Sequence, residues 1–115
     1  MNKYGAKKTT IGGITFDSIA EARRYCQLLV LARSNAIRGL SRQVSFDLCP
    51  SVKFKGAARA KPALRYVADF VYWTATGCPT MIVEDAKSPH LRNNPVFRIK
   101  MHLLKLEHGI EVVLV

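Results

Sequence analysis

Acidic residues are scarce in this chain of 115 residues, in which eight Asp and Glu stand against eighteen Lys and Arg and give a net charge of +10. A domain this basic typically binds a polyanion, because each neutralised phosphate releases condensed counterions. A merely soluble basic protein is the alternative that charge alone leaves open. Long apolar runs are also missing: the longest covers residues 28–32, whereas a membrane helix needs about 18 apolar residues. The sequence therefore predicts a nucleic-acid partner and no membrane span.

Cysteines are few and widely spaced, at Cys26, Cys49 and Cys78. Their number is odd, and they form neither a CxxC pair nor a zinc-ligand spacing, so we expect reduced structural thiols. The three histidines share no metal-ligand spacing either, so zinc is not indicated. Residues 1–5 lack the apolar stretch of a signal peptide. These absences favour a cytoplasmic protein.

The length suits one ordinary domain, and we expect residues 1–115 to form a single fold. Hydrophobic residues make up 49% of the chain and charged residues 23%, which is a globular composition. Residues 1–8 carry three lysines and are interpreted as a basic arm. Residues 9–16 are expected to form a small hairpin, because the Gly12-Gly13 pair suits a two-residue turn.

A helix should begin near Ser18, where Ser18 and Glu21 fit a capping box, and should end at 33–35. Its predicted apolar side includes Ala22, Cys26 and Val30. The remaining pattern predicts a half-buried strand at 44–48, a loop or irregular hairpin at 51–63, a central strand at 65–73, a strand at 81–87, a helix between Asn94 and Gly109, and a strand at 110–115. The expected fold is α/β, with the order αβββαβ and a mixed sheet.

Four of the eight acids fall in or beside predicted core elements: Glu21, Asp69, Glu84 and Asp85. Ionised groups in such places cost several kcal/mol unless they are paired or bind a metal. Three of these acids also have a plain structural explanation, and for Asp85 it is an ordinary surface pair with Lys87. Asp69 could pair with an arginine, and Glu21 could serve only the helix cap. Strand alternation places Asp85 and Lys87 on one face and directs Glu84 to the other, with Ile82.

Glu21 on the first helix, Tyr66-Val67-Ala68-Asp69-Phe70, and Val83-Glu84-Asp85-Ala86-Lys87 occur in this order, with Pro95-Val96-Phe97-Arg98-Ile99-Lys100 following. Together they resemble the PD-(D/E)XK nuclease superfamily, and more narrowly its small phage-encoded members. The αβββαβ order is also the restriction-endonuclease-like core of that superfamily. Three features depart from its usual pattern: Ala68 stands where the superfamily has Pro, Glu84 adds an acid before Asp85, and Ser88-Pro89 follows the lysine.

The resemblance implies a Mg²⁺- or Mn²⁺-dependent endonuclease that hydrolyses DNA phosphodiester bonds. Asp69, Asp85 and the Ala86 carbonyl would be metal ligands, since oxygen-rich sites select these cations. Glu21 would bind a second metal or orient a water. Lys87 would position the attacking water and stabilise charge on the phosphate. Lys100 could reach the same phosphate, although a solvated helical lysine is the plainer interpretation.

The other basic residues would follow the DNA backbone without reading sequence: Lys3, Lys7, Lys8, Lys53, Lys55, Arg59 and Lys61. No recognition helix is visible, so we expect a structure-selective enzyme of DNA recombination or processing, with four-way junctions as the favoured substrate. A homodimer is a possible form, with 110–115 as its candidate edge. Two alternatives stay open: a non-catalytic nucleic-acid-binding module on a nuclease fold, and a phage interaction factor.

Overall fold

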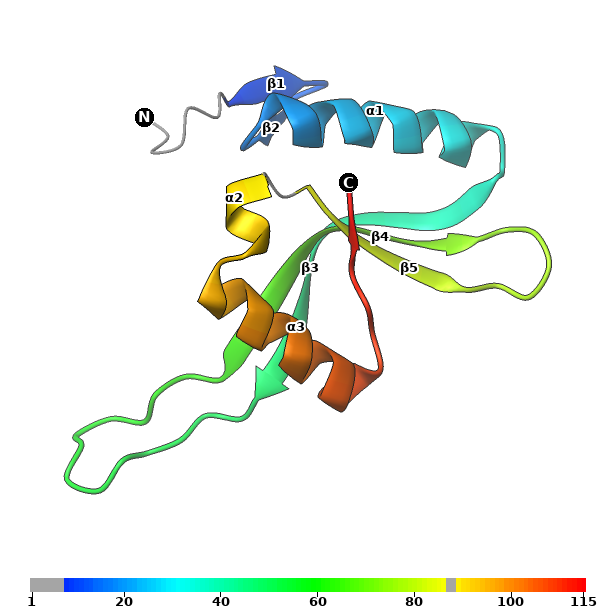
Figure 1. The fold of residues 1–115 in the computed structure, drawn as a ribbon. Helices are drawn as coiled ribbons and strands as arrows, with labels where there is room; N and C mark the ends of the chain where they lie inside the picture. Colours follow the sequence, from blue (N-terminus) through cyan, green and yellow to red (C-terminus); the bar gives the residue numbers. More distant parts are fainter. Residues whose placement is uncertain (1–7, 87–88) are drawn as a thin grey trace.

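A four-stranded mixed sheet lies at the centre of the computed structural model, which describes residues 8–86 and 89–115 (Figure 1). The strands are β3 (Ile37–Cys49), β4 (Leu64–Thr74), β5 (Met81–Asp85) and β6 (Val113–Leu114). They lie in the order β3-β4-β5-β6; the first three are antiparallel, and β6 runs parallel to β5. The prediction of a single mixed α/β domain is confirmed, and the strand over 65–73 is central, as expected.

A small hairpin and a long helix precede this sheet. β1 (Thr9–Ile11) pairs with β2 (Ile14–Phe16), and Gly12 and Gly13 both have positive φ, as a primed turn requires. α1 (Ile19–Arg33) follows, and the Ser18 hydroxyl accepts a hydrogen bond from the Glu21 N–H at 3.1 Å. Ala22 is buried on α1 as predicted, but the other buried residues are Glu21 and Leu28, and Val30 is exposed.

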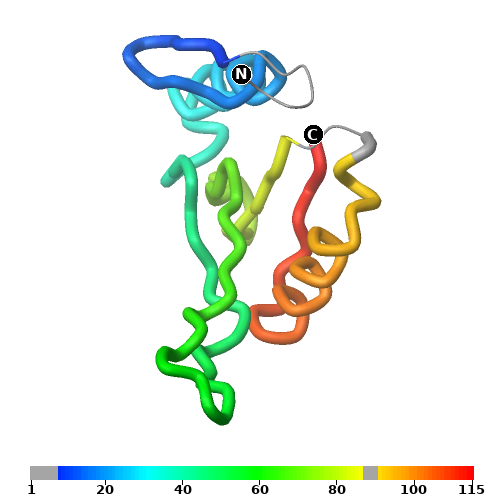
Figure 2. The backbone as a smooth tube through the Cα atoms, turned by 90° about the vertical axis from the view of Figure 1, so that its left-hand side faces the viewer, coloured from blue at the N-terminus to red at the C-terminus, as the bar shows by residue number. Residues whose placement is uncertain are grey.

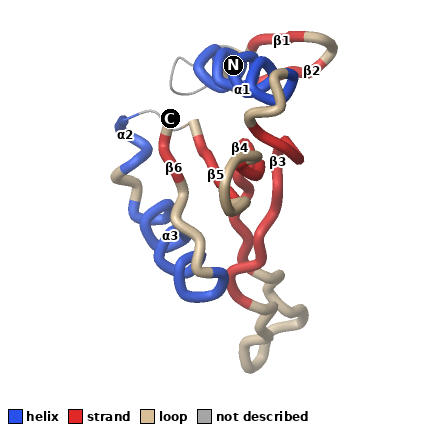
Figure 3. The backbone as a smooth tube through the Cα atoms, turned by 90° about the vertical axis from the view of Figure 1, so that its right-hand side faces the viewer, coloured by secondary structure: helices blue, strands red, loops and turns tan. Residues whose placement is uncertain are grey.

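β3 begins at Ile37, earlier than the predicted 44, because the alternation at 44–48 marks only its second half. Gly39, with a φ of 65°, lies at a register shift between Arg38 and Ser41. Segment 50–63 connects β3 to β4 and extends beyond the helices in all three views (Figures 1, 2 and 3). It is an irregular hairpin with one bridge, between Val52 and Lys61.

After β5 the chain forms α2 (Pro89–Arg92), which the sequence pattern did not predict, and then α3 (Pro95–His108). The boundaries of α3 agree with prediction: Asn94 caps its start, and Gly109 ends it in the left-handed conformation. β6 is shorter than the predicted strand at 110–115. No helix within the described residues is long and apolar enough to cross a membrane.

The sheet is covered by α1 and α3 on different parts of its two faces. Leu28 of α1 packs with Ile37, Phe70 and Tyr72, whereas Phe97 and Leu104 of α3 pack with Leu48, Tyr66, Ala68, Val71 and Val83. Residues two apart on a regular strand share a face, yet Ala68 and Phe70 lie in different cores. The side chains of β4 therefore switch faces of the sheet at Asp69. This switch determines where the candidate site forms.

Candidate active site

Three carboxylates from three different elements meet near the point where β4 switches faces. Glu21 comes from the first turn of α1, Asp69 from the middle of β4 and Asp85 from the end of β5. Glu21 and Asp85 are each only 4% exposed, and Asp69 is half-buried. The structure thus brings together the three acids that the sequence analysis selected.

The side chains of the neighbouring strand β3 switch faces at Gln43, beside Asp69. Arg42 and Val44 pair with Phe70 and Ala68, so Gln43 lies opposite Asp69. Its φ of 52° is in the left-handed region, which is uncommon for a residue other than glycine. Such conformations persist only where the surroundings enforce them and are concentrated at functional sites. The paired irregularity allows Asp69 to face both α1 and the end of β5.

Gln43 connects two of the acids directly. Its Nε2 donates to Glu21 Oε1 and to Asp69 Oδ1, each at 3.3 Å. The second oxygen of Asp69 accepts the Ala86 N–H at 2.8 Å, and Asp85 Oδ2 accepts the Tyr66 hydroxyl at 2.8 Å. The site is therefore held by donors from both sheet faces.

The surroundings of this cluster disfavour ionisation of its carboxyl groups. Burial raises the pKa of Asp69 to about 8; a hydrogen bond to Asp85 and the charges of Asp85 and Glu21 add to the rise, and the Ala86 N–H opposes it. Burial also raises the pKa of Glu21, reinforced by Asp17 and Asp85 and opposed by Arg42. Burial is thus the main cause of both raised pKa values, and repulsion between the neighbouring acids adds to it.

Arg42 lies close to Glu21, but it is an imperfect partner. Its Nη2 lies 3.6 Å from Glu21 Oε1, and its guanidinium lies over the rings of Phe16 and Tyr25, 4.4 and 5.6 Å from their centroids. Among the described residues its buried Nε has no hydrogen-bond partner. This loose contact is consistent with incomplete neutralisation of the acids.

Glu84 makes a separate and well-satisfied cluster on the other side of β5. It is 1% exposed and accepts two hydrogen bonds from Arg24 of α1, both at 2.7 Å, and a third from the Tyr72 hydroxyl. Burial and the Glu84 carboxylate raise the pKa of Tyr72 to about 12. The geometry gives the two neighbouring acids different surroundings, as strand alternation predicts.

The basic residues named in the sequence analysis fall into different places. Lys3, Lys7 and Lys87 lie outside the described residues. Lys8 is exposed before β1, and Lys53, Lys55, Arg59 and Lys61 are exposed on segment 50–63. Half-buried Lys100 lines a hollow of about 360 Å³ together with Arg65, Asn94 and Tyr66. Lys100 and the tyrosine that binds Asp85 therefore line the same hollow.

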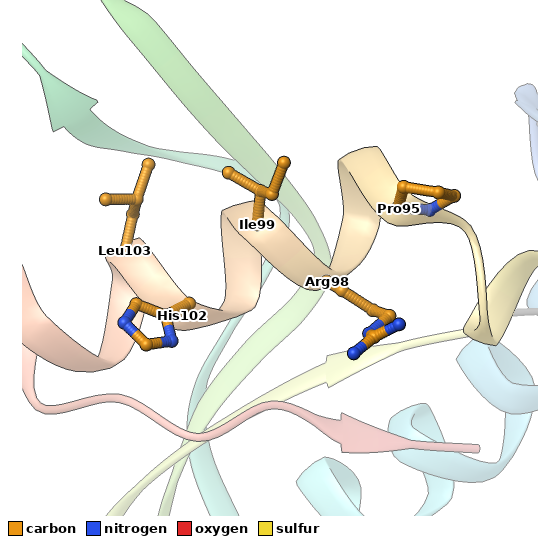
Figure 4. A pocket seen from close by; sticks show the side chains of 5 residues that line it. All are labelled: Pro95, Arg98, Ile99, His102 and Leu103. Atoms are coloured by element: carbon orange, nitrogen blue, oxygen red, sulfur yellow. The ribbon is translucent and has the colours of Figure 1, made fainter.

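Another hollow, of about 480 Å³, runs along α3 alone and has a different character (Figure 4). It is lined by Pro95, Arg98, Ile99, His102 and Leu103. It contains no carboxylate, so it lacks the chemistry of the Glu21–Asp69–Asp85 cluster.

Sequence reasoning missed the supporting residues of the site. Gln43 precedes the alternating stretch 44–48, where a polar residue looks like an ordinary solvent-facing position. Tyr66 looks like one more apolar strand residue, and only its hydroxyl contact with Asp85 reveals its role. The signal that could have indicated Arg24 is its place one turn after Glu21, on the side of α1 that faces the sheet.

The fold and site define a small basic α/β domain with a buried acidic cluster where two strands of its sheet switch faces. The chain belongs to the family described as "Protein of unknown function (DUF1064)", whose profile matches residues 1–111. Comparisons with curated proteins and with solved structures give no match.

Proposed function

We propose that this protein is a metal-dependent endonuclease of the PD-(D/E)XK type that hydrolyses DNA phosphodiester bonds. The observation that carries the proposal is the convergence of Glu21, Asp69 and Asp85, with the pKa of Asp69 raised to about 8, in a protein of net charge +10. A purely structural cluster would gain nothing from three repelling carboxylates. A site for a divalent cation needs them.

The donor set fits Mg²⁺ or Mn²⁺, which prefer oxygen ligands. Within residues 8–86 and 89–115, no three His, Cys, Asp or Glu side chains already form a group that could hold a metal ion. Asp69, Asp85 and the Ala86 carbonyl would hold the cation, with Glu21 at a second metal or a water. The bound cation would polarise the phosphate and lower the pKa of a coordinated water.

The chain's own residues would keep this site in position. The Tyr66 hydroxyl fixes one oxygen of Asp85, and the Ala86 N–H fixes one oxygen of Asp69. The Arg24–Glu84 pair joins α1 to β5 and so maintains the placement of Glu21 relative to Asp85. Lys87, two residues after Asp85, would stabilise charge on the scissile phosphate. Lys100 would contribute from the neighbouring hollow.

Substrate selection would depend on DNA shape. Exposed cations include Lys8 and the four on segment 50–63, which can contact phosphates and belong to no base-reading helix. We therefore favour branched DNA, with the four-way junction first, in phage recombination or DNA processing in the host cytoplasm. Symmetric junction cutting would require a homodimer, and β6, one of the two edge strands of the sheet, is the candidate surface for it.

One observation favours the non-catalytic binding module as a second candidate. Gln43 and Arg42 both contact Glu21, so part of the acidic cluster already has internal partners. This candidate predicts DNA binding that is indifferent to divalent cations. The long contact of 3.6 Å between Arg42 and Glu21 weighs against it, because a structural ion pair would be closer.

The deciding experiment incubates the protein with supercoiled plasmid, linear duplex and a four-way junction, each with Mg²⁺, Mn²⁺ or EDTA. The proposal predicts cleavage of at least one substrate with a cation and none with EDTA. Absence of metal-stimulated cleavage on all three, with DNA binding retained, would establish the binding module instead.

A further inference from the structure

Segment 50–63, called the hairpin arm below, protrudes from the domain. The radius of gyration is 16.4 Å and the longest extent 55 Å, whereas a compact domain of this length has a radius of about 13 Å. All three views place the hairpin arm beyond the layers formed by α1 and α3 (Figures 1, 2 and 3). None of its residues belongs to either hydrophobic core. The hairpin arm is therefore not required to bury the core.

The hairpin arm nevertheless has a defined conformation. Val52 and Lys61 exchange two backbone hydrogen bonds, of 3.1 and 2.6 Å. Beyond them the Ala57 N–H donates to the Phe54 carbonyl at 3.0 Å, and Gly56 has a φ of 82°. A four-residue turn with positive φ at its third position is of type II, which glycine favours. Phe54 thus begins a tight turn near the tip of the hairpin arm.

The chemistry of the hairpin arm combines cations with one exposed aromatic ring. Lys53, Lys55, Arg59 and Lys61 are all exposed, and no acid occurs between Asp47 and Asp69. Phe54, between two of these lysines, is 61% exposed. Leaving a phenylalanine in water forgoes the stabilisation that burial would give it. A ring flanked only by cations is therefore suited to a partner that offers both negative charge and an aromatic face.

Nucleic acid with unstacked bases is that partner, because its bases present π-faces and its phosphates surround them. A continuous duplex offers phosphates, but its base faces are already stacked. Branch points, gaps and single strands expose them. From Gln43 to Cys49 the strand β3 covers roughly 20 Å, which is the length of about six base pairs. A DNA substrate of ordinary length is therefore long enough to span the distance from the acidic cluster to the base of the hairpin arm.

We propose that the hairpin arm recognises branched or single-stranded DNA by stacking Phe54 on an unpaired base, while Lys53, Lys55, Arg59 and Lys61 contact the flanking phosphates. The proposal rests on the proposed function in that it takes DNA as the ligand. It adds the element that selects structure over sequence. It does not depend on metal binding or on cleavage.

The test measures DNA binding in EDTA, so that cleavage plays no part. Wild type, Phe54→Ala and Phe54→Trp are titrated with a four-way junction, a single strand and a continuous duplex, the first two carrying 2-aminopurine. Leu106→Ala is the matched control, because Leu106 is 70% exposed on α3, outside the hairpin arm. Because each base–aromatic stack contributes strongly to single-strand binding, Phe54→Ala should weaken junction and single-strand binding about tenfold or more. Duplex binding should stay unchanged, and Phe54→Trp should restore the wild-type affinities and the quenching of 2-aminopurine.

Several results would overturn the proposal. Equal losses on all three DNAs, no loss on any of them, or no DNA binding by wild type would each do so. Sedimentation provides a further one: if Phe54→Ala converts a dimer to a monomer and leaves junction affinity unchanged, the hairpin arm binds a second copy instead. The nuclease proposal fails separately, by lack of metal-stimulated cleavage in a protein whose Phe54 still discriminates among the DNAs.

Discussion

Replacing Glu84 by glutamine should destabilise the fold strongly, although Glu84 is not placed in the acidic cluster. The wild-type carboxylate is 1% exposed and accepts two hydrogen bonds from Arg24 and one from Tyr72. Glutamine offers one acceptor oxygen and sets an NH₂ donor against the remaining N–H or O–H groups. Breaking a buried ion pair from one side costs about 3–5 kcal/mol. Because the Arg24 side chain is 26% exposed and can be partly hydrated, we expect the lower end, about 3 kcal/mol.

Urea denaturation, followed by circular dichroism and the fluorescence of Trp73, measures this free energy. For a domain of this size the melting temperature should fall by roughly 12–24 °C. Glu111→Gln is the matched control, since it removes the same charge from an exposed pair with Lys105 at 2.9 Å and should leave unfolding unchanged. The triple variant Arg24→Met, Tyr72→Phe and Glu84→Leu should recover most of the loss, because apolar residues can replace a buried pair and no buried hydroxyl is left without its acceptor. A Glu84→Gln loss below about 1 kcal/mol would refute the reasoning.

Three further predictions concern the acidic cluster and the N-terminal arm. The raised pKa of Asp69 means that this group lowers the stability of wild type as pH rises from about 4 to about 8. Asp69→Asn should therefore gain stability relative to wild type over this range, as measured by urea titration. Parallel pH profiles of the two proteins would contradict this. Asp85→Asn should abolish metal-dependent cleavage at little cost in melting temperature, and exposed Asp47→Asn is the control that should stay active. A loss of about 3 kcal/mol or more in the free energy of unfolding of Asp85→Asn would make Asp85 a structural partner of Tyr66. Deleting residues 1–8 should reduce the slope of log K for DNA binding against log salt concentration by roughly 2–3 units. An unchanged slope would mean that this N-terminal arm does not touch DNA.

Local signals were sufficient for much of the fold. Ser18, Asn94 and Gly109 mark helix ends through backbone groups that the sequence alone identifies, and all three are found at those ends. The central position of β4 followed from its apolar character on both faces. The switch of faces in β4 could not be predicted, because alternation assumes a regular strand. The switch depends on Gln43 and Asp69 lying opposite each other across two strands.

The candidate site shows the same division. Glu21, Asp69 and Asp85 could be selected because carboxylates in core elements are anomalous in a basic chain. Their partners could not, since Gln43 and Tyr66 belong to residue types that are common on strands. For Glu21 the backbone N–H takes part in the helix cap at Ser18, whereas the carboxylate, which a reciprocal capping box would use, contacts Gln43.

The central claim is that the acidic cluster performs metal-dependent phosphodiester hydrolysis. Its most direct test is the single-turnover cleavage rate of a four-way junction with Mg²⁺, measured for wild type, Lys87→Ala and the exposed control Asp47→Asn. The account predicts metal-dependent cutting by wild type and Asp47→Asn, and none by Lys87→Ala, whose junction affinity stays within a few-fold of wild type. Lys87→Ala cutting at the wild-type rate, or no metal-dependent cutting by wild type, would contradict it.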